Sequence, residues 1–385
     1  MTVDGTVTGE TVTKAPEQGS TVVLTIDSKL QEVAETALKN NIEKIRNGGF
    51  SNRYDAKGGC VAVIDVHSGE ILAMASNPDY DPNAWVGGIS VAEYNQIKEN
   101  NSLFNKAISG SYAPGSIFKM VTALAGLESG VISTTEKIND TGIYTRYRDY
   151  QPRCWYYNSY HRGHGYLDVS GAIEKSCNYF FYETGNRMGI ETLDKYANYF
   201  GLGRKTGIEL PSETSGTLAS PEAAKKANET WSSGQTLQAA IGQSYNSFSP
   251  IQLVKYIGMV ANGGNKIKPT LIKRILNADG TESSKTEINE YVKEKLGLED
   301  DDSEELSFNQ ANIEAIKEGM RGVTSESGGT AYSTFKNFNI EVGGKTGSAQ
   351  TGVTGKTNAW FVGFAPFDDP EIAIVVFVRN GGHGG

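Results

Sequence analysis

Apolar and polar positions follow regular periods along parts of the chain, and each period predicts a type of secondary structure. The segment TVVLTID (21–27) alternates and is rich in β-branched residues, which is typical of a strand. Over 28–48 the apolar positions recur every three to four residues. This predicts an amphipathic helix that begins with a capping box of Ser28 and Gln31 and ends at Gly48. The apolar positions are Leu30, Val33, Leu38, Ile42 and Ile45.

Strand patterns lie near both ends of the chain, with helical patterns between them. GGCVAVIDV (58–66) and EILAMAS (70–76) predict two strands joined by the turn HSGE. Three further strands are predicted within 339–351, 358–367 and 371–380. We therefore expect an α+β fold, with an antiparallel sheet built from N- and C-terminal strands and flanked by helices. A helical subdomain, about 105–265, is inserted between the sheet-forming segments.

Composition limits the domain count and the class of partner. Residues 1–20 are polar and rich in Thr and Gly, typical of a linker or the remnant of a removed N-terminal domain, which leaves 21–385 as one domain. No apolar run approaches the roughly 18 residues that span a bilayer, so the chain as given is expected to be soluble. A net charge of -9 without a run of Lys or Arg argues against a nucleic-acid partner. Three cysteines exclude a disulfide-dense scaffold.

A candidate nucleophile opens the most apolar helical segment, GSIFKMVTALAGLESG (115–130). Ser116 and Lys119 are three residues apart, so a helix brings the hydroxyl and the amine to one face. A lysine buried at a helix end tends to lose its proton, which makes it a usable base. This S-x-x-K pair is a weak signal alone, because it often occurs by chance.

Two later segments strengthen the prediction. Ser176-Cys177-Asn178 joins two helical patterns and offers a hydroxyl and an amide. Lys345-Thr346-Gly347 lies in a strand whose glycines allow another chain to approach closely. The S-x-x-K and K-T-G motifs are signatures of penicillin-binding proteins and class A β-lactamases.

With these residues in place, the sequence resembles the transpeptidase domain of class B, monofunctional penicillin-binding proteins over roughly residues 20–380. The likeness extends beyond the motifs to FNKAISGSYAPGSIFKM, IGQSYNSFSPIQLVKYIGMVANGG, GGTA and AWFVGFAP. RYRDY, GHGYLDV and NYFFYETGNRMGI favour the elongation type over the division type.

The resemblance implies a peptidoglycan D,D-transpeptidase that cross-links stem peptides through an acyl-enzyme on Ser116. It implies that Lys119 takes the proton of Ser116, and that backbone N–H groups of Ser116 and Ser348 hold the oxyanion. An amine from a second stem peptide then resolves the acyl-enzyme, whereas β-lactam antibiotics stall it. No cofactor is required for this chemistry.

The same resemblance assigns the remaining motif residues. Ser176 relays a proton to the departing D-alanine, and Asn178 orients Lys119 and the substrate amide. Lys345 supplies positive potential. Thr346, Gly347 and Ser348 form the substrate-binding strand, where Thr346 and Ser348 bind the terminal carboxylate.

The resemblance also implies partners and a location for the full-length protein. The expected partner is a glycan polymerase. The expected location is the outer face of the cytoplasmic membrane, where an anchor and a pedestal domain, both expected to be absent from this chain, would hold the protein. The alternatives are a serine β-lactamase, which would hydrolyse its acyl-enzyme fast, and a β-lactam-sensing or binding domain, which would never transfer to an amine. Asn178 and the long insertion between the motifs favour the transpeptidase.

Two cysteines and two histidines gather within 24 residues: Cys154, His161, His164 and Cys177. Thiols and imidazoles suit a tetrahedral structural zinc with four protein ligands. Because its neighbours must face the active site, the Cys177 thiol is expected to point into the protein and tie the 154–164 loop to the back of the Ser176–Asn178 loop. The alternatives are a Cys154–Cys177 disulfide and simple core packing of Cys177.

Overall fold

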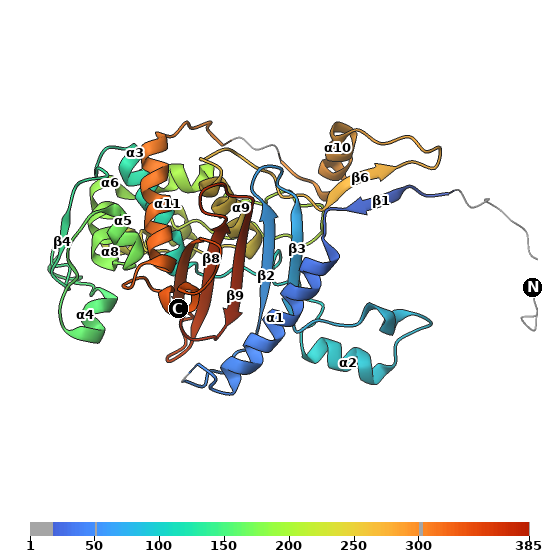
Figure 1. Cartoon of the computed structure of the whole chain (residues 1–385), viewed down its shortest axis with the longest axis horizontal. Helices are drawn as coiled ribbons and strands as arrows, with labels where there is room; N and C mark the ends of the chain where they lie inside the picture. Colours follow the sequence, from blue (N-terminus) through green and yellow to red (C-terminus); the bar gives the residue numbers. More distant parts are fainter. Residues whose placement is uncertain (1–17, 51, 300–302, 385) are drawn as a thin grey trace, which may run out of the picture.

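A five-stranded antiparallel sheet in the order β3-β2-β9-β8-β7 forms the centre of the molecule (Figure 1). The computed structural model describes residues 18–50, 52–299 and 303–384. Strands from opposite ends of the chain lie side by side, since β2 pairs along its whole length with β9. The predicted fold class is therefore confirmed. The strands are β2 (Gly58–Asp65), β3 (Ile71–Asn77), β7 (Gly343–Gln350), β8 (Thr357–Ala365) and β9 (Ile372–Arg379).

The first predicted strand belongs to a different sheet. β1 (Thr21–Leu24) pairs with β6 (Ile272–Leu276) in a separate two-stranded sheet. Val22 and Leu24 are exposed, so their alternation does not mark a face of the core. The strand exists, but it contributes nothing to the central sheet.

The first helix begins differently from its prediction. In α1 (Ser28–Arg46) the cap is Asp27, whose carboxylate accepts from the N–H groups of Lys29 and Leu30. The predicted capping box of Ser28 and Gln31 is wrong. The Gln31 amide instead accepts from the Met74 N–H (2.7 Å) and donates to the Met74 C=O (3.1 Å) in β3. These bonds fix α1 against one face of the sheet, where Leu38 and Ile42 are buried, whereas Val33 of the predicted stripe is exposed.

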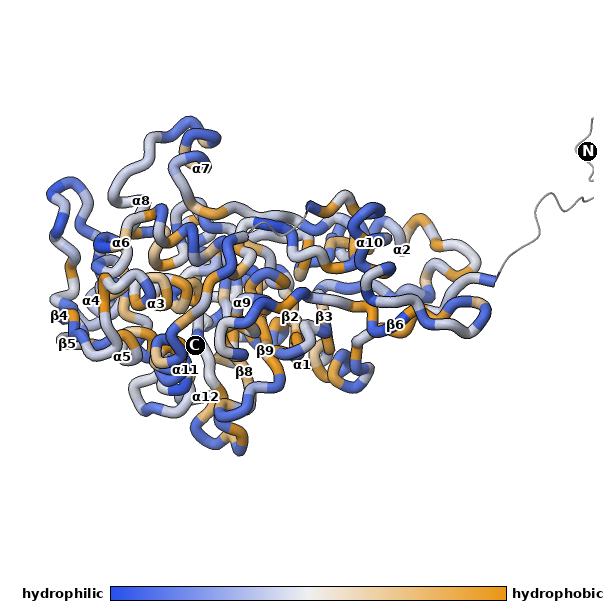
Figure 2. Tube along the Cα trace, turned by 90° about the horizontal axis from the view of Figure 1, so that it is seen from above, coloured by the Kyte–Doolittle hydropathy of each residue, from blue (hydrophilic) through white to orange (hydrophobic). Residues whose placement is uncertain are grey.

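The other face of the sheet carries the main core. α9 (Pro250–Ala261) packs on β2, β8 and β9, and α11 (Gln310–Ser325) packs on β7. Every residue of α9 is buried, as expected of a helix that is apolar all round. In Figure 2 the hydrophobic stretches gather along the sheet and α3, while the loops around α7 and the helix α10 are mostly hydrophilic.

The inserted segment is helical, as predicted, and lies beside the sheet (Figure 1). Its longest helix, α6 (Asn178–Tyr199), is broken at Gly189 (φ 77°, ψ 172°). The remaining elements are η1 (Pro82–Trp85), α2 (Val91–Glu99), η2 (Gly115–Phe118), α3 (Lys119–Glu128), β4 (Ile138–Asp140), α4 (Trp155–Tyr160), β5 (Gly165–Leu167), α5 (Val169–Glu174), α6 (Asn178–Tyr199), α7 (Pro221–Lys226), α8 (Ser233–Ala239), α10 (Lys285–Leu296) and α12 (Tyr332–Phe335).

The structure tests only part of the predictions about the N-terminal linker and about membrane-spanning segments. Residues 1–17, most of the predicted linker, lie outside the described residues, so the division at residue 20 stays a prediction. Among the helices that the structure describes, none is both long enough and apolar enough to cross a membrane.

Candidate active site

The candidate nucleophile lies on a tight turn between the helical region and the sheet. Ser116 is in the 3-10 turn η2, and the α-helix proper begins only at Lys119, so the two residues still stand one turn apart. Gly115 has φ +57°, and a Cβ there would lie 2.9 Å from the carbonyl oxygen of Ser348 in β7. Glycine is therefore required both for the backbone conformation and for the close approach of this turn to β7.

The Lys119 side chain is fully buried and reaches the Ser176–Asn178 loop. Its Nζ donates to the Ser176 carbonyl (2.8 Å), to Ser176 Oγ (3.3 Å) and to Asn178 Oδ1 (2.7 Å). Burial lowers the pKa of Lys119 from 10.5 to about 8. Near neutral pH a useful fraction of this amine is therefore unprotonated, as a general base requires.

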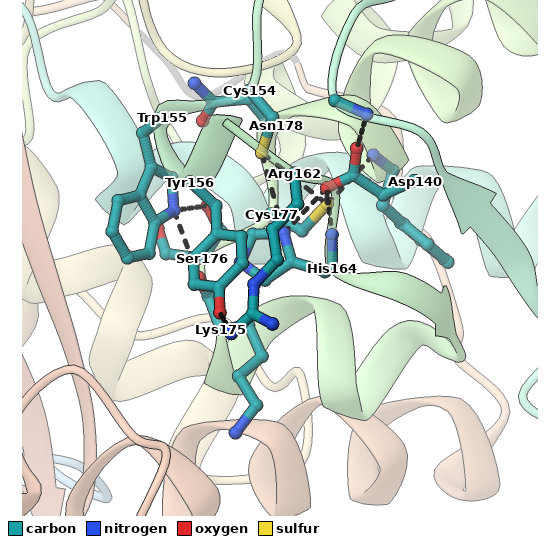
Figure 3. A network of polar contacts seen from close by, with 12 residues as sticks. Asp140, Cys154, Trp155, Tyr156, Arg162, His164, Lys175, Ser176, Cys177 and Asn178 are labelled. Carbon is teal, nitrogen blue, oxygen red and sulfur yellow. Dashed lines mark hydrogen bonds and ion pairs between the residues drawn. The ribbon is translucent and has the colours of Figure 1, made fainter. Parts of the chain in front are cut away.

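The Ser176–Asn178 loop turns sharply between α5 and α6. Ser176 has φ +53°, Cys177 caps α6, and Asn178 is the first residue of that helix. The indole N–H of Trp155 donates to the carbonyls of Lys175 and Ser176 (3.1 and 3.0 Å), which braces the turn from the 154–164 loop (Figure 3). The expectation that Cys177 points into the protein is confirmed, since its side chain is fully buried.

The strand β7 presents the third motif. Lys345 is fully buried and donates to the Thr346 carbonyl (3.0 Å). Burial, together with the nearby Lys119 amine, holds the pKa of Lys345 well below its usual range. A Cβ on Gly347 would lie 2.9 Å from Ile117 Cγ2, so this glycine lets η2 pack against the strand, as its position in the sequence suggested.

Two groups beside β7 were not singled out as site residues from the sequence. Thr330 Oγ1 lies 2.6 Å from Thr346 Oγ1. The imidazole of His383 lies 3.4 Å from Ser348 Oγ, which also accepts from the Gly384 N–H (3.2 Å). Thr330 lies in the GGTA segment, which was a usable signal. His383 lies among glycines, a pattern that indicated only a flexible or substrate-side loop.

The predicted zinc ligands meet only in part. Cys154, His164 and Cys177 come together with Asp140, and one donor atom from each lies within 4.8 Å of the others. His161 lies outside this cluster, which corrects the predicted ligand set. It ends α4 in a left-handed conformation, is exposed, and its ring packs against Tyr157. Asp140 takes its place, and no sequence spacing pointed to it.

The four side chains of this cluster are closely bonded to one another (Figure 3). Cys154 Sγ lies 4.0 Å from Cys177 Sγ and 3.6 Å from His164 Nδ1. Asp140 Oδ2 lies 2.7 Å from His164 Nδ1 and 3.3 Å from Cys177 Sγ. Both cysteines are free thiols, so the structure contains no Cys154–Cys177 disulfide. The hydrogen bond from Cys177 lowers the pKa of Cys154 to about 5.

Known proteins resemble this chain over most of its length. Residues 59–385 match the family described as "Penicillin binding protein transpeptidase domain". "Peptidoglycan D,D-transpeptidase MrdA" of Acinetobacter baumannii is 31% identical over 387 residues, covering 97% of this chain and 53% of that protein. The chain thus spans about half the length of the curated relatives it matches.

Solved structures give the same result. Pseudomonas aeruginosa PBP2 in complex with WCK 5153 is 32% identical with a TM-score of 0.79, covering 95% of this chain and 75% of that one. A chain from "Structural coordination of polymerization and crosslinking by a peptidoglycan synthase complex" is 30% identical with a TM-score of 0.80, covering 99% and 63%. These matches confirm the family expected from the motifs, and the chain belongs to the penicillin-binding protein transpeptidase domain family.

Proposed function

We propose that this chain is a peptidoglycan D,D-transpeptidase that acts through an acyl-enzyme on Ser116. The observation that carries the proposal is the buried Lys119 amine, one turn from Ser116 and bonded to both Ser176 and Asn178. Its lowered pKa of about 8 suits a base that works near neutral pH. The D,D-transpeptidase activity named for the Acinetobacter baumannii relative supports the same chemistry.

In the first half-reaction the Ser116 hydroxyl attacks the carbonyl between the two D-alanines. Neutral Lys119 takes the hydroxyl proton, the C–N bond breaks, and the leaving D-alanine receives a proton through Ser176. Backbone N–H groups of Ser116 and Ser348 bind the oxyanion, and removing one such donor typically costs about 10²–10³ in rate. The contact of Gly115 with Ser348 supports this pairing, since it brings the two backbone segments together.

The strand β7 would hold the donor peptide. Thr346 and Ser348 are assigned to its terminal carboxylate, and Gly347 to the close packing of the strand. Lys345 is assigned to the local positive potential, which it supplies in its protonated form, although burial beside Lys119 disfavours that form. In the second half-reaction the amine of an acceptor peptide attacks the acyl carbonyl and the C–Oγ bond breaks. Lys119 takes a proton from the amine and gives it to Ser116 Oγ. Asn178 keeps Lys119 in position for both transfers.

Labelling with a fluorescent penicillin tests the proposal. We expect the parent to form a covalent adduct and Ser116→Ala to form none; labelling of that variant would overturn the assignment. Release of the adduct within seconds would instead indicate a β-lactamase. A stable adduct in a protein that never transfers a donor peptide to an amine would indicate a sensing or binding domain.

The proposal extends to partners and location. The synthase-complex neighbour supports a glycan polymerase as the partner of the full-length protein. Together with cross-linking of peptidoglycan, this implies the outer face of the cytoplasmic membrane as the working location. We expect the full-length protein to co-purify with a membrane-embedded polymerase. Absence of the full-length protein from the membrane fraction would contradict the proposed location.

We also propose that the cluster of Asp140, Cys154, His164 and Cys177 holds a structural zinc ion. The donor set fits: two sulfurs, one imidazole nitrogen and one carboxylate oxygen are typical zinc ligands. At Zn–S distances of about 2.3 Å, two sulfurs in a tetrahedral site lie about 3.8 Å apart, close to the 4.0 Å found here. The ion would supply no acyl-transfer chemistry; its ligand Cys177 lies between Ser176 and Asn178 and would keep both in place.

Zinc content per chain tests this second proposal. Protein purified without added metal or chelator should contain about one zinc, and Cys177→Ser should contain little. His161→Asn is the matched control and should keep the zinc, because His161 lies outside the cluster. No zinc in the parent would refute the site and leave the three catalytic motifs unaffected.

A further inference from the structure

A pocket lies against α8, on the side of the inserted helical segment that carries α6. Its volume is about 710 Å³, within the range of small-molecule and peptide-side-chain sites. One wall is the 147–150 segment of the loop before α4. The other consists of α8 and the residues on either side of it. None of the three motifs contributes a side chain to its lining.

The lining has the chemistry of an ammonium site. The two walls each contribute a carboxylate, Asp149 and Glu229, and none of the described residues that line the pocket is a lysine or arginine. Three tyrosines also line the pocket, namely Tyr147, Tyr150 and Tyr245. Carboxylates and tyrosine faces together attract a cation on a flexible chain.

Hydrogen bonds hold these walls in position. The Tyr150 hydroxyl bonds the Gln238 amide, and a Cβ on Gly234 would lie 3.0 Å from the Tyr150 ring, so the ring lies directly on the backbone of α8. The Tyr245 hydroxyl donates to Glu229, and the Tyr147 hydroxyl donates to Asn186 of α6 (2.6 Å). The pocket is therefore formed before any ligand arrives.

The pocket adjoins the catalytic residues from the α6 side. Tyr147 of the pocket wall bonds Asn186 of α6, the helix that begins with Asn178, so one helix links the candidate catalytic amide to the pocket wall. α8 packs on α6 (Figure 1), and three residues beyond its end the Gly242 carbonyl accepts from the N–H of Gly115, next to the nucleophile (2.9 Å). The strand β7, assigned to the donor peptide, lies on the other side of Ser116.

We propose that this pocket binds the acceptor stem peptide and draws in its side-chain amine as an ammonium ion. The inference rests on the proposed transpeptidase function and deepens it. A lysine-like amine is almost fully protonated at neutral pH, so it arrives charged and is attracted by Asp149 and Glu229. It then loses one proton to solvent and attacks the acyl carbonyl. The new C–N bond replaces the C–Oγ bond, and the second amine proton passes through Lys119 to Ser116 Oγ.

The experiment compares the parent with Asp149→Asn/Glu229→Gln, which neutralises both carboxylates and keeps their shapes. Each protein is acylated with a thioester donor peptide, and the acyl-enzyme is offered a soluble stem peptide whose third residue carries a free amine. We expect the acceptor KM to rise about tenfold in the variant at low salt, and the difference to shrink at high salt, since rim charges act mainly by steering. The rate of donor consumption without acceptor should stay within about twofold.

Two controls separate acceptor binding from other effects. Hydroxylamine is uncharged at neutral pH and too small to need the pocket, so it should resolve both acyl-enzymes equally. Glu290→Gln/Glu294→Gln makes the same charge change on α10 and should leave the acceptor KM unchanged.

Three results would overturn the inference. An unchanged acceptor KM would show that the pocket does not bind the acceptor. A parallel loss of acylation by the donor or by penicillin would assign the pocket to the donor peptide or to the fold. An acyl-enzyme in the parent that transfers to no amine would refute the proposed transpeptidase itself, and the inference with it; that outcome is recognised without any variant.

Discussion

The pH dependence of acylation follows directly from the burial of Lys119. The side chain is fully buried, and this desolvation lowers its pKa from 10.5 to about 8. If the neutral amine is the base, the acylation rate follows the neutral fraction. That fraction rises about 50-fold between pH 6 and pH 8 and levels off above about pH 9. A lysine with an ordinary pKa would give a rate that still climbs tenfold per pH unit through pH 9.

The assay is the second-order rate constant for labelling by a fluorescent penicillin from pH 6 to pH 9.5, with unfolding checked at each end. Lys119→Arg retains a positive charge throughout this range and should be slow and nearly independent of pH. His383→Gln is the matched control, because it removes the imidazole beside Ser348 and keeps Lys119. Its profile should keep the midpoint near pH 8.

A flat profile in the parent would refute the role of Lys119 as the titrating base. A midpoint that moves in His383→Gln would assign the titration to the imidazole instead. A rate that still rises tenfold per unit above pH 9 would show that burial does not lower the lysine pKa as the structure implies.

Three further predictions test the same site. Lys119→Met should raise the free energy of unfolding at pH 7 by up to roughly 3 kcal/mol, because a native-state pKa of about 8 makes burial of the lysine costly below pH 8. This advantage should fade between about pH 8 and 10.5 in urea titrations, and an advantage independent of pH would contradict the reasoning. Asn178→Ala removes a 2.7 Å bond to the Lys119 amine, so penicillin acylation should slow roughly 10- to 100-fold with the fold intact by circular dichroism; an unchanged rate would contradict it. Gly347→Ala places a Cβ 2.9 Å from Ile117 and should slow acylation at least about tenfold, whereas Gly19→Ala, with open space around it, should label like the parent.

Much of the fold follows from local pattern. The apolar runs at 58–66, 70–76 and 371–380 form strands of one sheet, because an apolar strand is stable only when it is paired and covered. The pattern at 21–27 was equally clear, yet that strand pairs with β6 outside the main sheet. Its partner is more than 240 residues away, and a short alternating segment does not specify which edge it joins.

In the candidate site, too, the sequence predicted some features and left others to the tertiary structure. The three motifs, with the resemblance to penicillin-binding proteins, singled out Ser116, Lys119, Ser176, Asn178 and Lys345 as candidate site residues. Three of the four predicted metal ligands also meet. His161 and His164 were indistinguishable by residue type, and only the left-handed end of α4 turns one of them away from the cluster. Asp140 enters because β4 pairs with β5, next to His164.

The sequence by itself determined the family and the α+β character of the chain, and it singled out the candidate catalytic residues, since these depend on residue type and local period. Tertiary structure alone decided the quantities that depend on distance and solvent. Burial lowers the pKa of Lys119. The pairing of β4 with β5 brings Asp140, in place of His161, into the cluster. The packing of Tyr150 on α8 places Asp149 and Glu229 around one pocket, although 80 residues separate them in the sequence. Desolvation and contacts between distant segments exist only in the folded chain, so no local pattern records them.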